Sequence, residues 1–210
     1  MDPLSTTDRS SKATSERGTY RLIRTDPSDP SFRELVTELD KDLAIRDGKD
    51  HAFFAQFNGL DHIKHVVIVL EGTIPMGCGA IKVYSDEAME IKRMFVPPAH
   101  RQKGIASLVL RELECWALEL GYRRCVLETG QKQPEAIALY TERGYSVIPN
   151  YGQYIGVESS VCFEKRLPPG PTQERPGPER TSLGDTTADL LVGEEPNKNG
   201  SGDRASGPAG

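Results

Sequence analysis

The most specific chemical pattern in the chain lies between a strand and a helix, in RMFVPPAHRQKGIASLVL at residues 93–110. Pro97 and Pro98 end the strand, because proline cannot donate a hydrogen bond to a β-ladder. The helix that follows begins with N–H groups that have no intrahelical acceptor, and the helix dipole adds positive potential there. Such a helix start is suited to bind an anion.

The residue types within this turn favour a phosphate. Gly104 would let an anion approach the backbone closely, and Ala106 keeps the next contact small. Arg101 and Lys103 add positive charge beside them. The turn therefore predicts a pyrophosphate site, although a basic, glycine-containing start taken alone is also common in helices that bind nothing.

The spacing excludes two familiar phosphate motifs. Gly104 is followed by Ile105 and not by Lys-Ser or Lys-Thr, so the turn is not a nucleotide P-loop. The chain also contains no GxGxxG dinucleotide motif. The predicted pyrophosphate belongs to another class of ligand.

Strand and helix patterns alternate around this turn. Apolar runs predict strands at residues 19–25, 64–72, 75–85, 88–96, 123–130 and 159–167. Helical spacing of apolar residues predicts helices at 31–48, 51–60, 105–121 and 134–145, with Gly48 and Gly121 as C-caps. The expected fold is α/β of the α+β kind, with a mixed, mostly antiparallel central sheet flanked by helices.

Composition separates one folded domain, residues 18–167, from two polar ends. Residues 168–210 contain no aromatic side chain and are rich in proline, glycine and charge. Such a segment cannot bury enough apolar surface to offset its ordering entropy, so we predict a disordered tail, and likewise a disordered N-terminus at residues 1–17.

Charge and cysteine usage limit the partners. The net charge is -5, and residues 168–210 carry seven acids against four bases. The domain is then nearly neutral, which argues against nucleic-acid binding. No long apolar run and no signal-like N-terminus are visible, so we expect no membrane partner. The four cysteines have no CxxC spacing and fit a cytoplasmic protein. We expect no metal, because His62 and His65 run into a strand.

Two motifs at matching separation carry a family resemblance. Arg-x-x-Gly-x-Ala follows a strand ending in EIKRMFV, and ALYTERGY lies further on at residues 138–145. This pattern resembles the GNAT superfamily of acetyl-CoA-dependent N-acetyltransferases, of the small stand-alone type. The resemblance covers residues 18–167 and is strongest from Met89 to Tyr145. It implies a GNAT-like fold, with acetyl-CoA as co-substrate.

The resemblance also implies which residues hold the cofactor. Met94 and Val96 on the strand would pair with the pantetheine arm, and Gln133 stands on a second flanking helix where the family usually has asparagine. The turn that would hold the pyrophosphate consists of Arg101, Gln102, Lys103, Gly104, Ile105 and Ala106. Alanine at the last position is a substitution that the family pattern permits.

Acetyl transfer to an amine requires a base for the amine and an acid for the departing thiolate. Tyr140 stands where the family commonly places a tyrosine near the sulfur, which makes it the candidate acid; the alternative is an aromatic core residue. Glu90 stands where some members carry a catalytic carboxylate that acts directly or through a water. Its alternative is a charge on a solvated strand face or a partner for Lys92 or Arg93.

Two further features of the reaction follow from the resemblance and the residues. The backbone N–H of Met94 is a candidate donor to the oxyanion of the intermediate. No cysteine has a histidine partner at a recognisable spacing, so we expect direct attack in a ternary complex and no covalent enzyme intermediate.

The acceptor groove in this family is lined by the first two helices and by the loop before the last strand. These segments, residues 35–58 and 149–159, contain Asp40, Asp42, Asp47, Asp50, Tyr151 and Tyr154. The acids would attract a cationic amine or would simply form a solvated helix face. NYGQY resembles the corresponding loop of small stand-alone bacterial-type GNAT enzymes, and this resemblance implies a small-molecule, amino-acid-like amine acceptor over a histone tail.

Three classes of function stay open. The first is an N-acetyltransferase, for which a protein or peptide acceptor is the alternative substrate. The second is a non-catalytic acyl-CoA-binding or sensory module, and the third is an interaction protein whose tail recruits a partner. A homodimer is common in the family, and no residue here indicates or excludes it.

Overall fold

A computed structural model describes residues 20–168 of the chain, and the structural statements below concern these residues. The ends predicted to be disordered, residues 1–17 and 168–210, lie outside the described part apart from Pro168. The domain limits therefore stay predictions.

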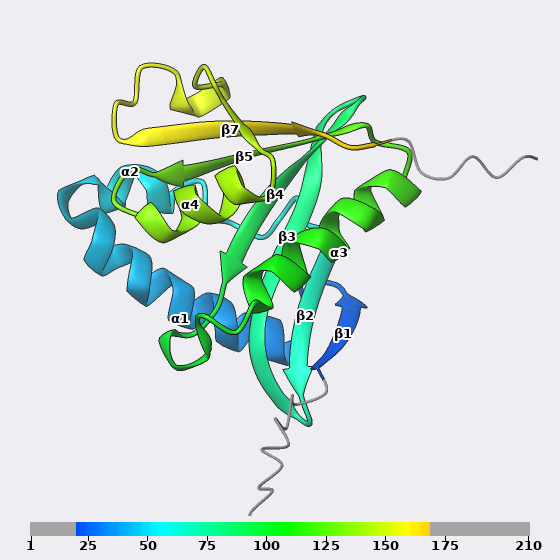
Figure 1. The fold of residues 1–210 in the computed structure, drawn as a ribbon. Helices are drawn as coiled ribbons and strands as arrows, with labels where there is room; N and C mark the ends of the chain where they lie inside the picture. The colour runs from blue at the N-terminus through cyan, green and yellow to red at the C-terminus, as the bar shows by residue number, and fades with distance from the viewer. Residues whose placement is uncertain (1–19, 169–210) are drawn as a thin grey trace, which may run out of the picture. The chain divides into compact units, whose positions relative to one another are not determined.

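A seven-stranded sheet forms the centre of the structure (Figure 1). Its strands are β1 (Tyr20–Thr25), β2 (His65–Glu71), β3 (Ile74–Ser85), β4 (Ala88–Phe95), β5 (Arg124–Gly130), β6 (Ser146–Ile148) and β7 (Ser160–Arg166). They lie in the order β1-β2-β3-β4-β5-β7-β6, and only β4 and β5 run parallel. The mixed, mostly antiparallel sheet predicted from the sequence is confirmed.

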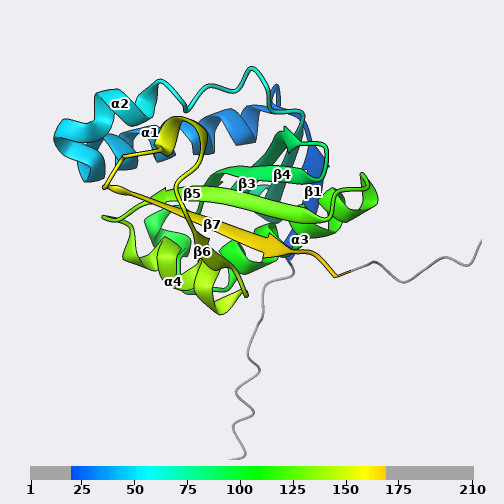
Figure 2. The same ribbon diagram turned by 90° about the horizontal axis from the view of Figure 1, so that it is seen from above.

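Helices cover both faces of this sheet (Figure 2). On one face lie α1 (Pro30–Asp47) and the short α2 (His51–Ala55), and on the other lie α3 (Ile105–Glu119) and α4 (Pro134–Glu142). Single 3-10 turns complete the connections: η1 (Gly48–Asp50), η2 (Pro98–His100) and η3 (Gly152–Tyr154). Within residues 20–168, no helix is long and apolar enough to cross a membrane.

The apolar stripe of each long helix accounts for its docking. The stripe of α3 is formed by Ile105, Val109, Leu110, Leu113 and Ala117, all buried against the sheet. On the opposite face, the buried side chains of α1 pack into a second cluster with β2 and β3. Burial of each such large side chain contributes about 2 kcal/mol, which holds both helices to the sheet.

Local signals define both ends of α1. The side chain of Asp29 accepts hydrogen bonds from the N–H groups of Ser31 and Phe32 and so caps the first turn. Gly48 ends the helix with φ of +58°, as predicted. The second helix is shorter than predicted and ends at Ala55, because the chain turns before Gly59.

The sheet opens between its two parallel strands. The β4–β5 ladder pairs only Ala88–Glu90 with Arg124–Val126, although β4 continues to Phe95 and β5 to Gly130. Beyond Glu90, the facing edges of the two strands have no ladder partner in each other within the described chain. Their backbone groups are therefore available to a ligand that enters between the strands.

A bulge in β4 lies beside this opening. The register with β3 shifts between Cys78 and Ala80, and Arg93 adopts φ of +57°. A left-handed conformation is strained for a residue with a side chain. The ion pair of Arg93 with Asp40 on α1, at 2.6 Å, holds it there. Because of the bulge, the consecutive residues Lys92 and Arg93 both line a cavity that lies in the opening between β4 and β5.

Candidate functional site

A cavity of about 480 Å³ occupies the opening between β4 and β5. Its wall is built from α1, the outer half of β4, the turn before α3, the end of β5 and the start of α4. A cavity of this size, with apolar and polar walls, is typical of a small-molecule or cofactor site. The splayed strands thus create the site themselves.

The start of α3 forms one end of the cavity. The first bond into the helix runs from the Leu108 N–H to the Gly104 carbonyl, and no side chain in residues 20–168 caps the earlier N–H groups. Gly104, Ile105 and Ala106 line the cavity with these free donors nearby. The geometry suits an anion.

The backbone conformation of Gly104 by itself favours glycine. Its φ of +77° is costly for other residues, and Gln102, two residues earlier, is also left-handed, with φ of +64°. A Cβ at Gly104 would meet no protein atom within 4 Å, so the close approach of an anion to this backbone stays a prediction.

Most of the residues that the family resemblance implied for the cofactor line this cavity. They are Met94, Val96, Arg101, Gln102, Gly104, Ile105, Ala106 and Gln133. Lys103 is exposed and does not belong to the wall. The strand ends at Phe95, one residue before the predicted Val96, and the Val96 carbonyl instead accepts a hydrogen bond from Arg101 Nε at 3.0 Å.

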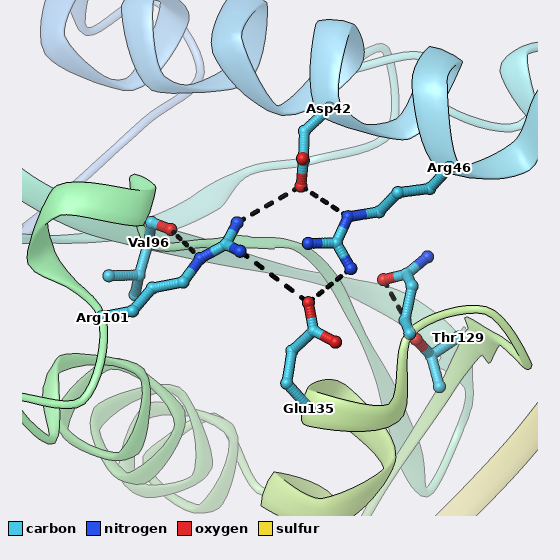
Figure 3. Close-up of polar contacts among 7 residues, drawn as sticks. Asp42, Arg46, Val96, Arg101, Thr129 and Glu135 are labelled. Carbon is cyan, nitrogen blue, oxygen red and sulfur yellow. Dashed lines mark hydrogen bonds and ion pairs between the residues drawn. The ribbon is translucent and has the colours of Figure 1, made fainter.

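Two arginines and two acids form a ring in the cavity wall (Figure 3). We call Asp42, Arg46, Arg101 and Glu135 the arginine–carboxylate ring. Asp42 Oδ2 lies 3.0 Å from Arg46 Nε and 3.3 Å from Arg101 Nη2. Glu135 Oε1 lies 2.5 Å from Arg46 Nη1 and 3.8 Å from Arg101 Nη1. The ring joins α1, the turn before α3 and α4, and all four residues line the cavity.

Tyr140 lies in the cavity wall and is buried. Its ring packs against Tyr145 and Phe163, as expected for an aromatic core residue, and its role as an acid stays a prediction. Burial, assisted by the charge of Glu128, raises the pKa of Tyr140 above its ordinary value. The phenol therefore stays protonated at neutral pH and can donate a hydrogen bond.

Glu90 does not line the cavity. Its side chain is 3% exposed, lies 3.0 Å from Lys82 Nζ and 3.7 Å from Lys92 Nζ, and accepts a hydrogen bond from the Tyr151 hydroxyl. The solvated strand face considered for Glu90 is wrong, and its pairing with Lys92 is confirmed. A carboxylate this fully partnered is well placed to hold β3, β4 and the following loop together, and poorly placed to reach an amine.

Glu128 on β5 is the titratable residue that the sequence analysis missed. It lines the cavity, and its Oε1 accepts a hydrogen bond from the Ser160 hydroxyl at 2.7 Å. Burial raises the pKa of Glu128 to about 7, with Glu90 and Asp47 adding to the rise against Ser160 and Lys92. An isolated glutamate in an apolar strand was the only sequence signal, and it does not reveal this environment.

Another part of the cavity wall comes from the end of α1, from α2 and from η3. Asp47, Phe54, Asn58 and Tyr154 contribute to it. Asp47 is buried, and burial raises its pKa against the opposing charges of His51 and Lys132. This part of the wall therefore carries a desolvated acid, whose charge also helps to raise the pKa of Glu128.

Of the other acids expected in an acceptor groove, Asp42 lines this cavity, and Asp40 and Asp50 do not. Asp42 belongs to the arginine–carboxylate ring, whereas Asp40 pairs with Arg93 and Asp50 with Lys132 at 3.3 Å. Tyr151 does not line the cavity, and its hydroxyl donates a hydrogen bond to Glu90. The acid-rich helix is thus neither uniformly solvated nor uniformly directed at the cavity.

Comparison with known proteins agrees with this geometry. The model of the Acetyltransferase (GNAT) family matches residues 24–145. IAA acetyltransferase of Azospirillum brasilense is 32% identical over 149 residues, which is 70% of this chain and 97% of the relative.

Solved structures share the fold. A Klebsiella pneumoniae protein described as an acyl-CoA N-acyltransferase has 27% identity and a TM-score of 0.60, over 71% of this chain and 99% of that one. A GNAT acetyltransferase of Elizabethkingia anophelis, solved with acetyl-CoA bound, has 17% identity and a TM-score of 0.52, over 70% of this chain and 98% of that one. The chain therefore belongs to the GNAT family of acetyltransferases and is an acyltransferase.

Proposed function

We propose that the protein transfers an acetyl group from acetyl-CoA to the primary amine of a small, amino-acid-like molecule, by direct attack in a ternary complex. The observation that carries the proposal is one continuous cavity, which joins the uncapped start of α3 to Tyr140 and Glu128. The pyrophosphate would lie at the helix start, and the pantetheine arm between β4 and β5. The related structure solved with acetyl-CoA supports this choice of co-substrate.

Glu128 is the proposed general base. A base acts best when its pKa is close to the working pH, and the pKa of Glu128 is raised to about 7. Its carboxylate would take a proton from the acceptor ammonium, and the neutral nitrogen would then attack the thioester carbonyl. This assignment replaces Glu90, which is buried among its own partners.

Tyr140 is the proposed general acid. When the tetrahedral intermediate collapses, the C–S bond breaks and the sulfur leaves with its electron pair. The protonated phenol of Tyr140 would give that sulfur its proton, and the Met94 N–H would stabilise the oxyanion before collapse. The nitrogen of the intermediate must lose a second proton, which Glu128 would take after releasing the first to solvent. In the balance the nitrogen loses two protons, the sulfur gains one, and one proton is released to solvent in each turnover.

The acids of the cavity wall favour a cationic, compact acceptor. Asp47 and Glu128 both line the cavity, and burial raises the pKa of each. Desolvated acids gain from a nearby cation. A cavity of about 480 Å³ that must also admit the end of the pantetheine arm leaves room for a small amine rather than a folded protein segment.

Ligand-dependent unfolding of the full chain tests the co-substrate. Acetyl-CoA at about a hundredfold excess over its Kd should add about 2.7 kcal/mol, which raises Tm by roughly 5–10 °C for a domain of this size. Coenzyme A should act alike, whereas ATP and Gly104→Glu with acetyl-CoA should give no rise. A panel of amino acids and small amines then tests turnover.

The outcomes separate the candidate functions. Acetylated product from a small amine, with both substrates required before either product is released, supports the proposal. Cofactor binding without product from any amine would favour the acyl-CoA sensor instead. The absence of any shift at saturating acetyl-CoA would refute the proposal altogether.

A further inference from the structure

The arginine–carboxylate ring has an unusual distribution of contacts. A single oxygen of Asp42, Oδ2, contacts both arginines. A single oxygen of Glu135, Oε1, also contacts both arginines. One oxygen shared by two guanidinium groups is the arrangement that a phosphate oxygen commonly offers. Both carboxylates thus occupy positions that suit phosphate oxygens.

The ring also lies where a phosphate is expected. Arg101 belongs to the turn at the start of α3, and its Nε is fixed to the Val96 carbonyl. Arg46 comes from α1, on the other side of the cavity, and reaches the same two acids (Figure 3). Two positive side chains from separate elements therefore converge in the cavity that the start of α3 also lines.

The exposure of the ring and the charge of the ligand allow a pyrophosphate to displace a carboxylate from the two arginines. The side chains of Arg46, Arg101 and Asp42 are 22%, 32% and 29% exposed, and that of Glu135 is 50% exposed. Ion pairs at this exposure are weak, because water and salt screen them. An incoming pyrophosphate carries two negative charges, so it competes well with a single carboxylate for the arginines.

We propose that Arg46 binds the cofactor phosphate together with Arg101, and that Glu135 holds both arginines in the empty enzyme as an internal substitute for that phosphate. The inference rests on the proposed function, because it requires a coenzyme A ligand. It adds a phosphate-binding residue from α1, which the motif around Gly104 does not contain. It also assigns Glu135 an opposing role, since its charge repels the ligand and its release frees the arginines.

The two members of the Arg46–Glu135 pair should have opposite effects on affinity. Arg46→Gln should raise the Kd of coenzyme A about tenfold, since one charge-assisted contact to phosphate is lost. Glu135→Gln should lower that Kd about threefold, since a competing exposed ion pair is lost. Isothermal titration calorimetry on the full chain at low and high salt measures both values. The salt dependence should be smaller for Arg46→Gln than for the unchanged protein.

Arg24 and Glu119 provide a matched control. They form an ion pair between β1 and α3, outside the cavity wall, and the Glu119 side chain is 57% exposed. Arg24→Gln and Glu119→Gln should leave the Kd of coenzyme A unchanged while lowering the unliganded Tm slightly. Arg46→Lys keeps the charge and should weaken binding less than Arg46→Gln.

The signs decide the outcome. If Arg46→Gln and Glu135→Gln both weaken coenzyme A binding, the ring is only a brace between α1 and α4, and the inference is wrong. An unchanged Kd for either variant also overturns it. If the unchanged protein is folded but does not bind coenzyme A, the proposed function fails first, which is a different result from a failure of the ring.

Discussion

Replacement of Glu128 by glutamine tests the proposed base through two independent quantities. Burial raises the pKa of this carboxyl from 4.5 to about 7. Glutamine keeps the size and the oxygen that accepts from Ser160, and it removes only the titrating charge. The variant should therefore fold, lose its catalytic base and become more stable at alkaline pH.

The stability effect follows from proton linkage. Since the pKa is higher in the folded state, the folded protein binds more protons than the unfolded chain between pH 4.5 and about 7. Stability from this group is then present at low pH and is lost as the pH rises through that window. The shift corresponds to about 3 kcal/mol, which partial solvent exposure reduces to about 1–2 kcal/mol. Above pH 8, Glu128→Gln should raise Tm by roughly 3–6 °C.

The activity should change in the opposite direction. Loss of a general base lowers kcat by about 10²–10⁴, and the kcat/KM of the unchanged enzyme should rise with pH through an apparent pKa near 7. Steady-state assays and thermal melts from pH 5 to 9 measure both effects. Glu142→Gln, at an exposed position of α4, is the control and should alter neither quantity.

An active, less stable Glu128→Gln would refute the reasoning. In that case the carboxylate would be a structural partner of Ser160, and the base would have to be sought elsewhere. If the variant is stabilised but fully active, the Glu128 carboxylate is a buried charge in the cavity that takes no part in proton transfer.

Three further predictions concern Tyr140, Glu90 and Gly104. Tyr140→Phe should lower kcat by about 10²-fold while the Kd of coenzyme A, measured by calorimetry, changes little; an equal loss of binding would make the residue structural. Glu90→Gln should lower stability by about 1–3 kcal/mol, because Lys82 and Lys92 lose a buried partner, and denaturant unfolding should detect this while the acid limb of the pH–rate profile stays in place. Gly104→Ala and Gly121→Ala should each lower the free energy of unfolding by about 1 kcal/mol, since both glycines have positive φ. Only Gly104→Ala should weaken coenzyme A binding. Equal affinities in the two variants would contradict the anion site at the start of α3.

The sequence by itself determined the features that depend on neighbouring residues. Prolines after β4 ended the strand, apolar spacing predicted α3, and Gly48 marked the end of α1. The turn from Arg101 to Ala106 could be assigned to an anion because the free N–H groups of a helix start depend only on the local backbone. Errors at this level were small, such as Phe95 in place of Val96 as the last strand residue.

Only the tertiary structure decided the chemistry of individual acids. Glu90 and Glu128 both stand in apolar strands, and nothing local separates them. Lys82, Lys92 and Tyr151 come from other elements to neutralise Glu90. Glu128 instead lies where β5 has left β4, and its burial raises its pKa. A pKa depends on solvent and charge in three dimensions, so residue spacing along the chain does not predict it.

The arginine–carboxylate ring illustrates the same limit for binding. Arg46, Arg101 and Glu135 lie on three elements that are separated in sequence, and no motif links them. They meet because α1 and α4 pack on opposite faces of the sheet and both lie at the opening between β4 and β5. The sequence predicts the backbone geometry of one turn. The side chains that complete the site come together where strands β4 and β5 separate, and that separation is a long-range property of the fold.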